Sequence, residues 1–200
     1  MSEIHYPAGI KPKAEIPHKT PTKSKRKLTI AAGNRGMDFE SEITETNLYY
    51  REKGLALFDK RPTPINVVKV DYTHGPKITE AYFEAQSTTD YNGVYKGKYV
   101  DFEAKSIHGK TSFPLSNIPR QQIEHLKEVL RQGGIGFFLI RFASRNVVFF
   151  VPAAYVIDFY ENRPRSSIPF EELEKHGREV KTAYRPRYDF LPLLDEFFLK

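Results

Sequence analysis

The chain has 200 residues, 40% of them hydrophobic, and a formal net charge of +6 at pH 7. This length and apolar content are enough for one domain with a sizeable core. Cysteine is absent, which excludes disulfide frameworks, thiolate zinc sites and cysteine nucleophiles and is compatible with a reducing cytosol. No apolar run reaches membrane-spanning length, and the N-terminus lacks the apolar region of a secretory signal. We therefore expect a cytoplasmic protein that does not contact a membrane.

The positive charge is concentrated in residues 1–33. This stretch holds seven lysines and arginines against two glutamates, a net charge of +5, whereas residues 34–200 add only +1. Four prolines and a single aromatic residue are spread among the basic residues, so the segment is not expected to fold by itself. A flexible basic arm favours salt-sensitive, sequence-independent contact with nucleic acid. The alternative is an extension that only increases solubility.

Residues 34–85 are expected to form a helix followed by short strands. Asn34 or Asp38 can cap the helix, and Gly54 ends it. Strand-like runs follow at 55–58, 67–72 and 78–85. The second run alternates valines with charged residues, a pattern that suits an exposed ribbon better than a buried strand. The two prolines before it prevent regular pairing, so we predict a projecting stalk over residues 60–85.

The most informative stretch contains Asp90, Glu103 and Lys105. Successive side chains of a strand alternate between its faces, so Glu103 and Lys105 share one surface. If Asp90 lies beside them across the intervening turn, two carboxylates and one ammonium group converge. Few carboxylates and several waters are what Mg²⁺ prefers, and a neighbouring lysine can orient water or neutralise a phosphate. This arrangement suits metal-dependent cleavage of a phosphodiester, although an acid and a lysine two apart also occur as a weak surface pair. Asp101 shares the same face and is either a supporting or a solvated acid.

The rest of the chain predicts a sheet covered by helices. Asn117 can cap a helix that has Pro119 in its first turn and stops at Gly133. Further strands are predicted at 136–142 and 147–151, the first buried on both faces, and short helices at 153–160, 170–176 and 190–198. The order of elements indicates an α/β fold with a mixed central sheet. The six histidines show no metal-ligand spacing, and His125 is interpreted as a helix-surface residue.

Longer motifs carry a family resemblance. The sequences Asn34-Arg35-Gly36, Thr88-Thr89-Asp90-Tyr91-Asn92-Gly93, Tyr99-Val100-Asp101-Phe102-Glu103-Ala104-Lys105 and Gln122-Ile123-Glu124-His125 resemble the RecU Holliday junction resolvases, a branch of the PD-(D/E)xK nuclease superfamily. The resemblance spans residue 34 to the C-terminus. It implies a restriction-endonuclease-like nuclease domain over residues 34–200, from which the stalk projects.

The resemblance also implies roles for individual residues. Its counterparts of Thr88, Asp90, Glu103 and Gln122 form a Mg²⁺ site in which Mn²⁺ substitutes, and the counterpart of Lys105 stabilises the transition state. Arg120-Gln121-Gln122 departs from the family, where a histidine is expected before the glutamine. Asp90, Glu103 and Lys105 are accordingly the expected catalytic residues, and Glu40 is expected to tune the site from the first helix.

The implied substrate is a four-way DNA junction, which is resolved by paired symmetric cuts during recombination and repair. Because the junction has approximate two-fold symmetry, a homodimer is the economical assembly. The expected DNA contacts are Arg35, Lys60, Arg61, Lys69 and Lys77. Recombinase and branch-migration proteins are expected partners, and the enzyme is expected to be associated with the nucleoid.

Two alternatives remain open from the sequence. Instead of a junction resolvase, the chain could be a restriction or repair nuclease of the same superfamily. It could also be a junction-binding and strand-annealing module in which cleavage is secondary. The basic, proline-interrupted projection argues against the first alternative, because a minimal nuclease core lacks it. The intact set of Asp90, Glu103 and Lys105 argues against the second.

Overall fold

A computed structural model describes residues 32–84 and 88–199, with side chains from Phe39 onward in the first helix. The predicted basic arm lies outside the described residues except for its last two positions. The helices are α1 (Ala32–Glu52), the 3₁₀ turn η1 (Leu115–Asn117), α2 (Arg120–Arg131), α3 (Ala153–Asn162), α4 (Phe170–His176) and α5 (Leu191–Phe198). No helix within the described ranges is long and apolar enough to cross a membrane.

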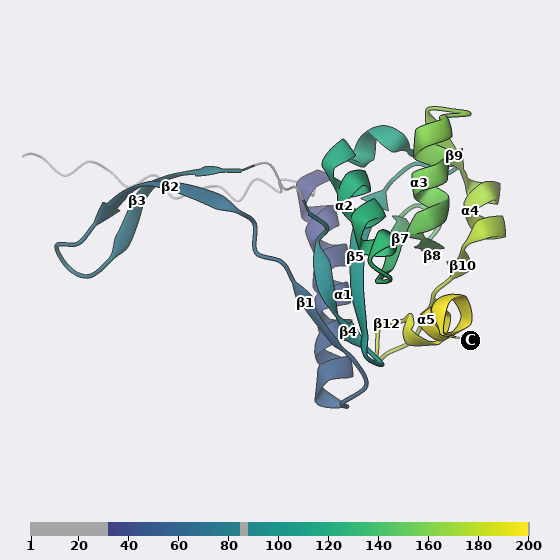
Figure 1. Cartoon of the computed structure of the whole chain (residues 1–200), viewed down its shortest axis with the longest axis horizontal. Helices are drawn as coiled ribbons and strands as arrows, with labels where there is room; N and C mark the ends of the chain where they lie inside the picture. The colour runs from purple at the N-terminus through teal and green to yellow at the C-terminus, as the bar shows by residue number, and fades with distance from the viewer. Residues whose placement is uncertain (1–31, 85–87, 200) are drawn as a thin grey trace, which may run out of the picture. The chain divides into compact units, whose positions relative to one another are not determined.

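Six strands form the central sheet, in the order β1-β4-β5-β7-β8-β10. Their bounds are β1 (Leu57–Lys60), β4 (Tyr91–Tyr95), β5 (Lys98–Ile107), β7 (Ile135–Phe142), β8 (Val147–Pro152) and β10 (Arg178–Glu179). β5 and β7 are parallel and the other neighbours are antiparallel. Helix α2 makes the crossover that a parallel pair requires (Figure 1). The predicted α/β class with a mixed sheet flanked by helices is thus confirmed.

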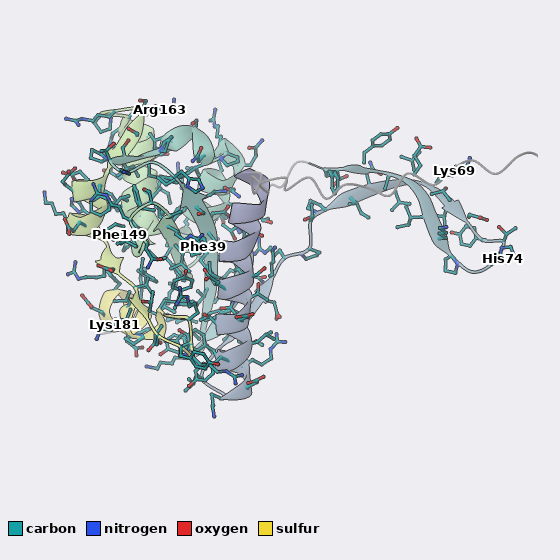
Figure 2. The ribbon with its side chains drawn as sticks, turned by 180° about the vertical axis from the view of Figure 1, so that it is seen from behind. Phe39, Lys69, His74, Phe149, Arg163 and Lys181 are labelled. Atoms are coloured by element: carbon teal, nitrogen blue, oxygen red, sulfur yellow. The ribbon has the colours of Figure 1, made fainter. Side chains whose placement is uncertain are left out.

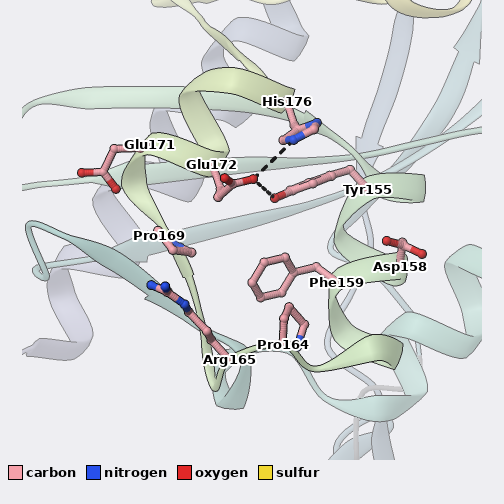
Figure 3. Close-up of a pocket in the computed structure, with 9 residues that line it drawn as sticks. All are labelled: Tyr155, Asp158, Phe159, Pro164, Arg165, Pro169, Glu171, Glu172 and His176. Carbon is pink, nitrogen blue, oxygen red and sulfur yellow. Dashed lines mark hydrogen bonds and ion pairs between the residues drawn. The ribbon is translucent and has the colours of Figure 1, made fainter.

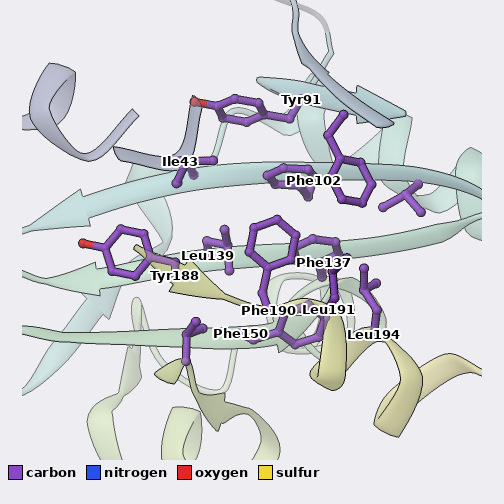
Figure 4. Close-up of a cluster of buried hydrophobic side chains, with 14 of the residues drawn as sticks. Ile43, Tyr91, Phe102, Phe137, Leu139, Phe150, Tyr188, Phe190, Leu191 and Leu194 are labelled. Carbon is purple, nitrogen blue, oxygen red and sulfur yellow. The ribbon is translucent and has the colours of Figure 1, made fainter. Parts of the chain in front are cut away.

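Helices cover both faces of the sheet and create two hydrophobic clusters. On one face α1 and α5 pack against alternate residues of β4, β5, β7 and β8, as Figure 4 shows. On the other face α2, α3 and α4 pack against the intervening residues. The rings of Tyr91, Phe102, Phe137 and Phe150 stack across four neighbouring strands, with centroids 4.8, 4.6 and 4.3 Å apart in turn. This aromatic row fixes the register of the central strand β5 against its neighbours.

Short pairs of strands complete the fold. β6 (Ser112–Pro114) pairs with β9 (Ser167–Pro169), and β11 (Lys181–Thr182) pairs with β12 (Tyr188–Asp189). Both pairs are too short to be read from sequence periodicity. The predicted cap of α2 was wrong: Asn117 belongs to η1, and Pro119 occupies the N-cap without a side-chain hydrogen bond. The turn preceding α2 therefore fixes its start.

The predicted hairpin is present as a separate two-stranded ribbon. β2 (Ile65–Asp71) and β3 (Lys77–Phe83) pair only with each other among the described strands, and nearly all of their residues are exposed (Figure 1). Lys60, in contrast, is the last residue of β1 and pairs with Tyr91 of the central sheet. The backbone N–H of Arg61 also donates to the Asp90 carbonyl at 2.8 Å. The ribbon consequently begins after Arg61, and the placement of Lys60 and Arg61 on the projection was wrong.

Candidate active site

Strand β5 presents a row of polar side chains to helix α2. Its register turns Val100, Phe102 and Ala104 into the cluster beneath α1, so Asp101, Glu103 and Lys105 lie on the opposite face. Because β5 lies between two other strands and is covered by helices, the side chains of Asp101 and Glu103 are 0% exposed. The predicted alternation is confirmed, but the face that carries the acids is buried rather than solvated.

Asp90 joins this row because β4 runs antiparallel to β5. Asp90 lies immediately before β4, and its backbone N–H donates to Glu103 Oε2 at 3.0 Å. In return the Ala104 N–H approaches Asp90 Oδ2 at 3.4 Å. The Lys105 ammonium group forms an ion pair with Glu103 Oε1. The structure therefore brings together the two acids and the lysine that the sequence singles out.

Burial raises the pKa of the Glu103 carboxyl group. Removal from water and the negative charge of Asp90 raise its pKa from 4.5 to about 8, although Lys105 opposes the shift. Two carboxylates and one lysine at a buried position leave an excess of negative charge when both acids are ionised. A further cation would remove this penalty.

Neutral oxygens of Gln122 and Thr88 lie near the two carboxylates and are of a kind that could also bind a cation. Gln122 enters from the first turn of α2, where its Nε2 approaches the Thr88 carbonyl at 3.4 Å. Its Oε1 is buried and accepts no hydrogen bond from the described residues. A buried amide oxygen without a donor is costly unless another group satisfies it. Among the described residues no group of three His, Cys, Asp or Glu side chains is placed to hold a metal ion. Two carboxylates together with neutral oxygens form a ligand set of the kind that Mg²⁺ accepts.

Glu40 contacts Lys60 and Tyr91, two residues of the central sheet next to this cluster. Its carboxylate forms an ion pair with Lys60 at 2.5 Å, and its backbone carbonyl accepts a hydrogen bond from the Tyr91 hydroxyl at 2.9 Å. Tyr91 is the first residue of β4, and in the aromatic row its ring stacks on Phe102 of β5. Glu40 is therefore placed to hold the end of β1 and the start of β4, and any influence on Glu103 passes through those strands.

A hydrogen-bonded network around Asp101 was not foreseen. The Asp101 carboxylate accepts hydrogen bonds from Arg61 Nη2 at 2.6 Å and from the Tyr99 hydroxyl at 2.7 Å, and the Thr89 hydroxyl also contacts it. His125 Nε2 lies 3.0 Å from the same carboxylate. The interpretation of His125 as a helix-surface residue was therefore wrong. The network ties β5 to the root of the ribbon and to α2, one turn after Gln122.

This network assigns Arg61 a structural position. Its side chain is only 18% exposed, and Asp101 is fully buried, so removing the guanidinium leaves a buried charge with fewer partners. We expect Arg61→Leu to lower the free energy of unfolding by about 3 kcal/mol. Arg51→Leu, which breaks an exposed ion pair with Asp59, should cost less than about 1 kcal/mol. Urea unfolding without DNA measures both. A stable Arg61 variant that loses only DNA binding would instead support the original prediction for Arg61.

The other predicted DNA contacts lie in different settings. Lys69 and Lys77 are exposed on the ribbon, where neither forms an ion pair with another described residue (Figure 2 labels Lys69). Lys60 is engaged by Glu40. Arg35 lies in α1, but its side chain is outside the described part of the chain. The contacts of these residues with DNA stay predictions.

Comparisons with known proteins identify the family to which this chain belongs. A family model described as RecU, Recombination protein U, matches residues 34–196. A curated Holliday junction resolvase RecU of Geobacillus sp. (strain WCH70) is 46% identical over 184 residues, which are 88% of this chain and 90% of the relative. The protein of the same name from Lactococcus lactis subsp. cremoris (strain MG1363) is 49% identical over 175 residues, 86% and 82% of the two chains.

A solved structure offers a weaker likeness. The Holliday junction resolvase Hjc of Archaeoglobus fulgidus is 12% identical, with a TM-score of 0.42, and the match covers 72% of this chain and 94% of that one. The assignment rests instead on the family model and on relatives that share more than two fifths of their residues over most of the chain. The chain belongs to the RecU family.

Proposed function

We propose that this chain is a Mg²⁺-dependent endodeoxyribonuclease that resolves Holliday junctions by paired symmetric cuts, with Mn²⁺ able to replace Mg²⁺. The observation that carries the proposal is the cluster in which Asp90 and Lys105 meet the fully buried Glu103, in a chain of the RecU family. The cluster contains the carboxylates that hold a hard cation and the lysine that phosphoryl chemistry needs.

The residues divide the work as follows. Asp90 and Glu103 would hold the cation, and Gln122 and Thr88 would contribute neutral oxygens or contacts to its waters. A bound divalent cation supplies positive charge that stabilises the charge developing on the phosphate. Lys105, fixed by its ion pair with Glu103, orients the attacking water or donates to the charged phosphate oxygens. In-line attack forms a bond from the water oxygen to phosphorus and breaks one P–O ester bond of DNA. The attacking water gives up one proton to solvent, and the leaving oxygen takes up one proton from solvent, so the net reaction adds one water across the broken bond.

The shape of the substrate favours two copies of the chain. A four-way junction has approximate two-fold symmetry and needs two cuts to yield two duplexes, so a symmetric homodimer supplies two active sites in matching geometry. The basic arm and the ribbon are proposed to contact the DNA. A junction-resolving enzyme would act at the nucleoid in the cytoplasm, together with recombinase and branch-migration proteins.

A direct cleavage assay tests the proposal. The purified protein is incubated with Mg²⁺ and a labelled four-way junction, beside a linear duplex of the same sequence. Symmetric nicks in opposite strands of the junction, with little cutting of the duplex, are expected. Equal cutting of both substrates would point to a general nuclease, and binding without cutting in Mg²⁺ or Mn²⁺ would point to a junction-binding module.

The raised pKa of Glu103 gives a prediction for metal binding. Below about pH 8 the metal-free carboxyl group carries a proton, which must leave when a cation binds. The apparent affinity for Mg²⁺ should therefore rise with pH, by about tenfold per unit between pH 6 and 7, and level off as the pH passes 8. Isothermal titration of the DNA-free protein measures it. Glu124→Gln, at an exposed position of α2, should keep this slope. An affinity that does not change from pH 6 to 8 would contradict the prediction.

A further inference from the structure

The arginines of this protein are distributed unevenly between paired and unpaired states. Among those whose side chains the structure describes, Arg145, Arg163 and Arg165 form no ion pair with a carboxylate, whereas each of the others does. Arginine at a structural position is normally matched by an acid, because its charge cannot be neutralised by deprotonation. Arginines left without a partner are available for an anion from outside the chain.

The three arginines lie on turns that are tied to a single segment, residues 107–116, which follows Lys105. The turn that carries Arg145 is held there because the Ala143 N–H donates to the Ile107 carbonyl at 2.8 Å. The loop that carries Arg163 and Arg165 leads into β9, which pairs with β6. This segment connects Lys105 on β5 to Gln122 on α2. The turns that carry these arginines are therefore held by the chain segment that links the two elements supplying Lys105 and Gln122.

Arg163 and Arg165 line a hollow of about 860 Å³, whose walls come from residues 112–118 and residues 160–167. Its lining also includes four serines, Ser112, Ser116, Ser166 and Ser167, and none of the lining residues is acidic. The Leu115 N–H donates to the Ser166 carbonyl at 3.0 Å, so the two sides of the hollow are joined by a backbone hydrogen bond. Hydroxyl groups and guanidinium groups are the donors that protein surfaces use for DNA phosphates. We call this feature the arginine-serine hollow.

The position of Arg163 is fixed before any ligand arrives. It ends α3 in the left-handed conformation, with φ 41°, and its Nε lies 3.3 Å from the Tyr160 carbonyl. Its guanidinium lies over the Tyr160 ring, 4.8 Å from the centroid. Figure 2 shows Arg163 at the outer edge of the domain. Such a held guanidinium loses less conformational freedom when it binds a phosphate than a free side chain does.

The neighbouring hollow has the opposite character. Arg165 lines this hollow as well, but here it stands among three acids, Asp158, Glu171 and Glu172, as Figure 3 shows. Glu172 is hydrogen bonded to Tyr155 at 3.3 Å and lies 3.3 Å from His176 Nε2. Three carboxylates would repel a phosphate, so an anionic ligand is directed to the arginine-serine hollow and away from this one.

We propose that the arginine-serine hollow binds backbone phosphates of a DNA duplex arm beside the cleaved phosphodiester. The inference rests on the proposed function and adds a contact surface distinct from the ribbon and the N-terminal arm. A duplex is the ligand favoured here because the segment that walls the hollow also joins Lys105 to Gln122 along the chain, and DNA is the polyanion that the proposed active site takes. The contact reads no bases and steadies the arm during the cut.

The test compares a double variant with a charge-matched control. Arg163→Asn with Arg165→Gln removes both charges, and asparagine tolerates the left-handed backbone at residue 163. Arg131→Gln with Arg185→Gln removes two charges that exposed glutamates already neutralise. Thermal unfolding checks that both variants are folded. Junction affinity is then measured without cleavage, in Ca²⁺, across a series of salt concentrations, on junctions whose arms are shortened in steps.

We expect the variant at residues 163 and 165 to lower the slope of log affinity against log salt by about two units, with the control unchanged. The wild-type protein should lose affinity when the arms become too short to reach the hollow, and the variant should not. An unchanged slope, or an equal loss in the control, would overturn the inference while wild-type junction cleavage persists. If the wild-type protein neither binds nor cleaves junctions, the proposed function fails instead.

Discussion

Replacing Glu103 by glutamine is expected to abolish junction cleavage while leaving junction binding nearly unchanged. The substitution keeps the shape of a fully buried side chain but removes one of the two negative charges that would hold the cation. A 0% exposed side chain contributes no DNA-contacting surface, and affinity for DNA rests on phosphate contacts elsewhere. The cleavage rate should fall on the order of 10³-fold or more. Single-turnover cleavage and gel-shift assays on the same labelled junction measure the two effects.

Three further variants test and control this prediction. Asp90→Asn removes the other carboxylate and should have the same effect, whereas Glu124→Gln makes the same chemical change as Glu103→Gln on the exposed surface of α2 and should cut normally. Lys105→Ala should bind the junction without cutting it, since it loses the ammonium group beside the reacting phosphate. Normal cleavage by the Glu103 or Asp90 variant in Mg²⁺ would remove both residues from the site.

The core of this site could be predicted because it depends on local rules. Strand alternation alone places Glu103 and Lys105 side by side, and one antiparallel turn is enough to bring Asp90 to them. The run Phe137 to Ile140 likewise predicts a strand covered on both faces, and β7 is buried throughout that run. These inferences need no knowledge of distant contacts.

The network around Asp101 shows where such rules end. Alternation places Asp101 on the same face as Glu103 but cannot decide between a solvated acid and a buried one. That choice depends on Arg61, 40 residues before it, and on His125, 24 residues after it. Neither contact leaves a periodic signal in the sequence. The only available hint was the abundance of polar residues on a strand whose neighbours are apolar.

The ribbon boundary was missed for a related reason. Prolines after Arg61 correctly signal the end of regular pairing. They do not show that β1 continues to Lys60, because that pairing depends on β4, which is far along the chain. Short pairs such as β6 with β9 are similarly set by tertiary contacts and carry too few residues for a pattern.

Replacing the ribbon by a short Gly/Ser turn is expected to remove the preference for four-way junctions over linear duplex. The excision should run from residue 64 to residue 84, which keeps Lys60 and Arg61 in their contacts with the domain. The ribbon pairs only with itself among the described strands, so the central sheet and the active site should fold without it. Its exposed Lys69 and Lys77 form no ion pair with described residues and are free to neutralise phosphates where strands converge.

Competition binding at one salt concentration, with the variant confirmed to be folded and in the same oligomeric state as the wild-type protein, measures this preference. The ratio of junction to duplex affinity should fall toward one, while affinity for duplex should change much less, because the proposed contacts of the basic arm and the domain surface with duplex would remain. Lys69→Gln with Lys77→Gln should reproduce part of the loss, and Lys98→Gln with Lys181→Gln, two exposed lysines outside the ribbon, should not. If the ribbon-free protein keeps its full junction preference, the ribbon is not the source of selectivity, and the paired active sites of the proposed homodimer would have to recognise the branch without an inserted segment.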